Sequence, residues 1–149
     1  MKKVVIFLVM AFGINAMAHL GGPCSVEEKK CVIRGFNIDG NVLNESEAST
    51  IREIVNDLNK YGKSGTIDII GHTDSTGSQK HNLKLSETRA KNFARLMREF
   101  GLDKRFSFGK IKGEGANSPV DTDDRVDGRY NNRRVEILLN NVEFETSGK

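Results

Sequence analysis

The stretch TIDIIGHTDSTGSQKHNLKLSETRAKNF, residues 66–93, decides how this chain folds. Residues 66–70 are rich in β-branched side chains and predict a strand. Residues 71–77 (GHTDSTG) are polar and bounded by glycine, which predicts a loop. From Gln79 onward, apolar residues recur at helical spacing, and the expected helix runs to Phe100 before Gly101 closes it. The stretch therefore predicts a strand, a polar loop and an amphipathic helix in direct succession.

Upstream, the chain shows the same succession of strand and helix. Residues 31–36 (CVIRGF) predict a strand, and a turn rich in Asn, Asp and Gly follows. Asn44 stands where a helix N-cap is expected, with Glu47 at the spacing of a capping box. Apolar residues then recur every three or four positions until Gly62, which is placed to end this helix.

Downstream, residues 106–112 and 134–139 (RVEILL) predict two further strands, joined by a polar loop that contains Pro119 and four Asp residues. The order is β-α-β-α-β-β. It predicts an α/β (α+β) sandwich, with a mixed four-stranded sheet and both helices packed on one face. The order of the strands across the sheet does not follow from these patterns. Residues 141–149 are expected to form a polar tail.

The N-terminal residues have the pattern of a secretory signal peptide over residues 1–18. A basic start precedes the apolar run 4–12 (VVIFLVMAF), and Ala16-Met17-Ala18 matches a signal-peptidase site. The alternative is an uncleaved membrane anchor. A membrane span needs about 20 apolar residues, and polar Asn15 interrupts the run earlier. Residues 19–31 are then a short leader, and residues 32–140 form the domain.

Charge and cysteine content narrow the function classes. Without Lys2 and Lys3 the count of Lys and Arg falls from 23 to 21 against 20 acids, so nothing indicates a nucleic-acid partner. Cys24 and Cys31 have no further Cys or His pair at zinc-ligand spacing, and in an exported protein they are expected to form a disulfide. Pro23 stands where a lipoprotein signal requires a small residue before Cys24, so no lipid anchor is expected.

Three separated sequence blocks occur together: GHTDSTG (71–77), NLKLSETRA (82–90) and GRYNNRRVEI (128–137), with GEGANSP (113–119) as a link. Together they resemble the C-terminal domain of outer-membrane protein A and its relatives, the OmpA-like peptidoglycan-binding domain. The resemblance runs from about residue 32 to residue 139. It implies a domain that binds the peptide stem of peptidoglycan at its diamino acid.

The resemblance also implies which residues make the site. Asp74 is expected to take the ammonium group of the diamino acid and Arg89 its carboxylate, with Asn82 and Arg133 beside them and Asn37 in the first loop. The chemistry is consistent, because the free end of such a residue is a zwitterion and the planar Arg fork suits a carboxylate. Asn82 and Arg89 are seven residues apart on the expected helix and so share a face.

Each of these residues also has a plainer interpretation. Asp74 is a residue type that caps turns. Arg89 is also interpretable as a solvated helix residue near Glu87. Arg133 and Arg134 precede a strand, where one of them is expected to face solvent at an edge. The coincidence of the three blocks favours the binding site.

Other chemistries receive less support. His72, Asp74 and His81 suggest a metal or acid–base set, but no helix-borne ligand stands at the required spacing. Ser75 lacks the sequence surroundings of a nucleophilic serine. The four Asp residues of the loop lack the Gly and Glu positions of a calcium loop, which favours a solvated loop. They are Asp121, Asp123, Asp124 and Asp127.

The sequence therefore predicts a binding module of the periplasm, associated with the cell wall or outer membrane. It is expected to be no enzyme, to carry no cofactor and to bind peptidoglycan. The leader that contains Cys24 and Cys31 is the expected place for an outer-membrane or envelope protein to dock. The alternative is a periplasmic assembly protein that keeps the fold without wall binding, because the first-strand motif, residues 35–38, is less aromatic than the pattern it resembles.

Overall fold

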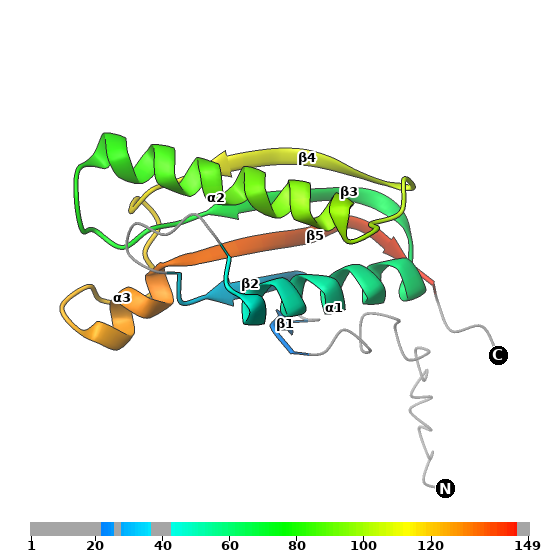
Figure 1. The fold of residues 1–149 in the computed structure, drawn as a ribbon, viewed down its shortest axis with the longest axis horizontal. Coiled ribbons are helices and arrows are strands. Elements are labelled where there is room, and N and C mark those ends of the chain that lie inside the picture. Colours follow the sequence, from blue (N-terminus) through cyan, green and yellow to red (C-terminus); the bar gives the residue numbers. More distant parts are fainter. Residues whose placement is uncertain (1–21, 26–27, 37–42, 146–149) are drawn as a thin grey trace, which may run out of the picture.

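The computed structural model describes residues 22–25, 28–36 and 43–145, which Figure 1 shows as one layer of strands and one of helices. The strands are β1 (Cys24–Ser25), β2 (Lys30–Arg34), β3 (Gly62–Gly71), β4 (Phe106–Gly113) and β5 (Arg134–Phe144). The helices are α1 (Glu45–Tyr61), α2 (Gln79–Glu99) and α3 (Val126–Asn132). The expected signal segment, residues 1–18, lies outside the described residues. Within the described ranges, no helix is both long and apolar enough to cross a bilayer.

The strands form one mixed sheet in the order β1-β2-β5-β3-β4. β3 and β4 are parallel, and the other neighbours are antiparallel. The prediction of four strands is wrong by one, because β1 adds a fifth at the edge. Two residues are too few to give a periodic signal, and β1 is joined to β2 by the disulfide between Cys24 and Cys31. The predicted disulfide is thus confirmed.

Both long helices lie against the same face of the sheet, as predicted (Figure 1). β-strand side chains alternate between the two faces, and here one set of alternating residues meets the apolar stripes of α1 and α2. Ile54 and Leu58 of α1 and Phe93 and Met97 of α2 are all at most 2% exposed. Among the described residues, the opposite face of the sheet carries no long helix. The core therefore lies between one sheet face and two helices.

The beginning of α1 shows why the helix starts where the sequence predicts. The Glu47 amide donates to Oδ1 of Asn44, and the Asn44 amide donates to Oε2 of Glu47, both at 2.9 Å. This reciprocal capping box satisfies two amides that have no partner within the helix. The helix ends at Tyr61, and Gly62 begins β3.

Two segments differ from the sequence prediction. β5 continues through residues 141–144, where a polar tail is expected, because Phe144 pairs with Gly62 of β3. The loop before β5 contains the short helix α3, whose seven residues are too few for a reliable helical period. Figure 1 shows α3 at one end of the sheet, beside the first residues of β5.

Candidate functional site

The order of the strands gathers the predicted residues at one end of the sheet. β5 lies between β2 and β3, and its first residues pair with their last ones: Arg134 with Arg34, and Val135 with Gly71. The segments that follow β2 and β3 therefore meet the segment that precedes β5. These segments contain Phe36, the loop after β3 and Arg133.

Asp74 lies in the loop after β3 and is 2% exposed. Its Oδ1 accepts from the Thr76 amide at 2.9 Å, and its Oδ2 accepts from Nη1 of Arg133 at 2.8 Å. Burial by itself raises the pKa of Asp74, but the hydrogen bonds from Arg133 and Thr76 outweigh it and hold the pKa below its usual value. Asp74 is therefore ionised at neutral pH. The turn-capping role is present as well, through the Thr76 amide.

Arg133 joins this carboxylate to the end of the first strand. Its Nε donates to the carbonyl of Phe36, while its Nη1 bonds Asp74. The Arg133 side chain is 13% exposed, and Arg134 is 2% exposed. The expectation that one of these arginines faces solvent at a strand edge is thus wrong, because β5 is an interior strand of the sheet.

Arg89 is 1% exposed, so its interpretation as a solvated helix residue is also wrong. Its Nη1 donates to the carbonyl of His72 at 3.3 Å, and its guanidinium lies 5.0 Å from the ring centroid of Phe36, a cation–π contact. Glu47 of α1 is a further neighbour. Burial raises the pKa of Glu47, while the Asn44 amide and the Arg89 charge act in the opposite direction.

Asn82, on the same face of α2, donates from Nδ2 to the Asp74 carbonyl at 3.3 Å and is 4% exposed. The shared helix face of Asn82 and Arg89 is confirmed, since both contact residues 72–74. Asn37 lies outside the described residues. The structure thus places Asp74, Asn82, Arg89 and Arg133 around one loop, and we call these four residues the Asp74 site.

A tight packing contact fixes where this loop begins. A Cβ atom on Gly71 would lie 2.1 Å from the carbonyl oxygen of Ser86, so α2 approaches the end of β3 more closely than any side chain allows. Ser86 also donates to the Leu83 carbonyl and accepts from the Gly115 amide at 2.9 Å. These contacts hold the loop, α2 and the segment after β4 together.

Two further residues support the loop after β3, although their role was not predicted from the sequence. Asp123 accepts from the Ser75 amide at 2.8 Å, and Asn132, which is fully buried, donates to Asp123 at 2.7 Å. Burial raises the pKa of Asp123, but the hydrogen bonds from Ser75 and Asn132 lower it further than burial raises it. The loop of four Asp residues before β5, which was expected to be solvated, therefore supports the loop after β3 through Asp123. The only available signal was the position of Asn132 directly before Arg133.

Phe36 was also missed as a site residue. It is 2% exposed, its carbonyl accepts from Arg133 and its ring contacts both Arg89 and Phe93. Its signal was a single aromatic residue directly after the first strand. Among the described residues, no three His, Cys, Asp or Glu side chains gather in a way that could hold a metal ion.

This chain is similar in sequence to known proteins. The sequence profile of the OmpA family matches residues 35–133. The probable lipoprotein YiaD of Escherichia coli is 33% identical over 104 residues, which cover 70% of this chain and 46% of YiaD. The peptidoglycan-binding protein ArfA of Mycobacterium tuberculosis is 31% identical over 127 residues, which cover 85% of this chain and 34% of ArfA. This chain thus spans less than half of the length of either relative.

A solved structure shows the same fold. The cell wall anchor of the T6SS from Pseudomonas aeruginosa superposes with a TM-score of 0.60 at 28% identity. The match covers 77% of this chain and 80% of that one.

Proposed function

This chain belongs to the OmpA family, and on that premise we propose that it binds peptidoglycan non-covalently through the diamino acid of the stem peptide. It is a binding protein of the cell envelope and not an enzyme. Two relatives support the polymer as ligand, since ArfA is a peptidoglycan-binding protein and the T6SS protein is a cell wall anchor. The periplasm, at the cell wall or the outer membrane, is the corresponding location.

The observation that carries the proposal is that an ionised, buried carboxylate, Asp74, lies in the loop after β3, while the buried guanidinium of Arg89 on α2 contacts the same loop at the His72 carbonyl. The free end of a diaminopimelate-type residue carries an ammonium and a carboxylate group. In our proposal Asp74 accepts the ammonium group and Arg89 donates to the carboxylate. Asn82 and Arg133 complete the polar surroundings, and Asn37 is a further proposed contact outside the described residues.

Burial determines how a ligand enters. Asp74 and Arg89 are 2% and 1% exposed, so in our proposal a ligand reaches them only after a neighbouring side chain moves. Arg133 is the most accessible of the four and occupies Oδ2 of Asp74. We propose that the ligand ammonium replaces the Arg133 guanidinium at this oxygen. The exchange keeps the buried carboxylate paired throughout, which avoids the cost of an uncompensated buried charge.

Co-sedimentation of residues 19–149 with purified peptidoglycan tests the proposal. Asp74→Asn keeps the shape of the side chain and removes the charge, and Arg89→Lys keeps the charge and removes the planar fork. Asp124→Asn and Arg95→Lys are matched controls, because both residues are exposed. Wild type and controls are expected to pellet with the wall, while folded Asp74→Asn and Arg89→Lys stay soluble.

Soluble muropeptides test the role of each charge. A stem peptide with diaminopimelate offers both groups, its amidated form lacks the carboxylate charge, and a lysine stem lacks the carboxylate altogether. We expect wild type to prefer the first by about tenfold or more, a preference that Arg89→Lys should abolish. Equal binding of all three peptides would refute the role of Arg89.

The alternative is an assembly protein on the same fold without wall binding, which the burial of Asp74 and Arg89 favours. A wild type that remains in the supernatant supports this alternative. We separately propose that an outer-membrane or envelope protein docks at the leader. Cys24 of this leader is half-buried at the edge of the sheet. Because Lys30 and Cys31 belong to β2, its test must keep them and delete only residues 19–25.

A further inference from the structure

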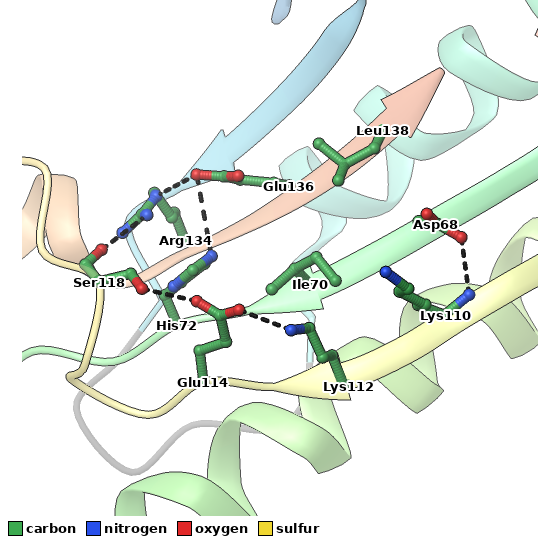
Figure 2. A pocket seen from close by; sticks show the side chains of 10 residues that line it. All are labelled: Asp68, Ile70, His72, Lys110, Lys112, Glu114, Ser118, Arg134, Glu136 and Leu138. Carbon is green, nitrogen blue, oxygen red and sulfur yellow. Dashed lines mark hydrogen bonds and ion pairs between the residues drawn. The ribbon is translucent and has the colours of Figure 1, made fainter. Parts of the chain in front are cut away.

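The sheet face opposite α1 and α2 holds a cavity of about 250 Å³. Alternation along β3 turns Ile67 and Ile69 to the core and Ile70 and His72 to this other face. Figure 2 shows side chains from β3, β4, β5 and the segment after β4 around the cavity. We call it the His72 cavity. It lies on the other side of the sheet from the helix face that carries Arg89.

His72 is 3% exposed, yet neither of its ring nitrogens has a hydrogen-bond partner among the described residues. The nearest carboxylate oxygen, Oε1 of Glu136, is 3.8 Å from Nε2, beyond hydrogen-bond distance. Burial and the Arg134 charge lower the pKa of His72 to about 4, so the ring is neutral at pH 7. A neutral imidazole offers one N–H donor and one acceptor. An unpaired buried polar group costs free energy, so a ligand that hydrogen-bonds the His72 ring is favoured.

The charged groups around His72 are already paired with each other. Nε of Arg134 contacts Oε1 of Glu136 at 2.8 Å, and Nζ of Lys112 contacts Oε1 of Glu114 at 2.8 Å (Figure 2). The other residues with formal charge at the cavity are Asp68 and Lys110, so three carboxylates face three cations. This balance favours neither an anion nor a cation, and a neutral ligand is the best match.

Shape and apolar surface restrict the ligand further. Ile70 and Leu138 give the cavity an apolar wall beside the polar groups (Figure 2). The volume is slightly below the roughly 300–1,000 Å³ of sites for drug-sized molecules, so it suits a single small ring. Hydroxyl groups both donate and accept hydrogen bonds, so they match the paired charged side chains and both nitrogens of the neutral imidazole. A pyranose ring combines such hydroxyls with an apolar face.

We propose that the His72 cavity binds one pyranose unit of a neutral saccharide. Its hydroxyl groups bond His72 and the paired charges, and the apolar face of the ring packs on Ile70 and Leu138. The proposal does not depend on peptidoglycan binding at the Asp74 site, because the two sites use opposite faces of the sheet.

NMR titration of the full domain with methyl β-glucoside tests the inference. Saturable shifts of both His72 ring nitrogens are expected, while those of the exposed His81 stay constant. N-acetylglycinamide offers amides without a sugar ring and should give no saturable shift. Absence of saturation with methyl β-glucoside, or an equal response to N-acetylglycinamide, overturns the proposal.

Two variants localise the binding. His72→Leu removes the donor and the acceptor and should abolish the sugar response of the neighbouring amides. Leu138→Ser changes only a half-buried wall, so the test stays valid if the first variant misfolds. The affinity of this variant for the sugar should fall about tenfold. Leu83→Ser, at an exposed site on α2, is the matched control and should bind as wild type does. If Leu138→Ser folds and retains wild-type affinity, the sugar binds elsewhere.

Discussion

Asn132→Ala tests whether one buried amide side chain holds the loop that supports Asp74. Asn132 is fully buried and makes four hydrogen bonds with the segment before α3. Its Oδ1 accepts from the amides of Val120 and Asp121 at 2.8 and 3.1 Å, and its Nδ2 donates to the Asp121 carbonyl and to Asp123 at 2.8 and 2.7 Å. Alanine removes all four bonds at once.

The expected loss follows from these contacts. A hydrogen bond contributes roughly 0.5–1.5 kcal/mol net, so four contribute about 2–6 kcal/mol. Val120 is exposed and Asp121 partly exposed, so water replaces some of the lost partners. We therefore expect the free energy of unfolding to fall by about 3 kcal/mol, and the melting temperature by about 10 °C.

Urea denaturation followed by circular dichroism measures this loss, with Asn131→Ala as the matched control. Asn131 makes one hydrogen bond, to Oδ2 of Asp121 at 2.8 Å, and its removal should cost less than about 1 kcal/mol. Equal losses in the two variants would refute the role of Asn132. Muropeptide affinity well below the melting temperature provides a second readout, because Asp123 also holds the Ser75 amide. Unchanged affinity would show that this loop does not position Asp74.

Three further outcomes are expected. The unfolded chain binds a proton at His72 near pH 6.5 and the folded chain only near pH 4, so stability should fall by up to about 3 kcal/mol as the pH drops through this window. His72→Gln should flatten that part of the stability–pH profile measured by urea denaturation. Gly71→Ala should prevent folding or cost several kcal/mol in thermal melts, because its Cβ would overlap the Ser86 carbonyl. Reduction of the bond between Cys24 and Cys31 should cost about 2.5 kcal/mol of unfolding free energy.

Controls or contradicting results check these outcomes. His81→Gln, at an exposed position, should leave the pH profile unchanged; an unaltered slope in His72→Gln would contradict the assignment to His72. Gly101→Ala places a Cβ in open space at φ +90° and should cost only about 1 kcal/mol. A melting temperature that does not change with reductant would show that the bond between Cys24 and Cys31 adds nothing to the stability of the protein.

Local patterns in the sequence were sufficient for most secondary structure. The Asn44 and Glu47 spacing placed the start of α1, and the run at residues 66–70 located β3, which extends further at both ends. These predictions succeeded because a cap or an alternating strand depends on residues only a few positions apart. β1 and α3 were not predicted for the same reason, because two and seven residues are too few for a period to repeat.

By itself, the sequence determined the two amphipathic helices, the disulfide and the loop that carries Asp74. Only the tertiary structure decided that Arg89 is buried and that Asp74 pairs with Arg133, 59 residues away in the chain. It also decided that Arg133 reaches the carbonyl of Phe36, 97 residues away. The physical reason is the interior position of β5, which brings the ends of β2 and β3 to the beginning of β5. No local period encodes that strand order, because it arises from the packing of the complete sheet against its helices.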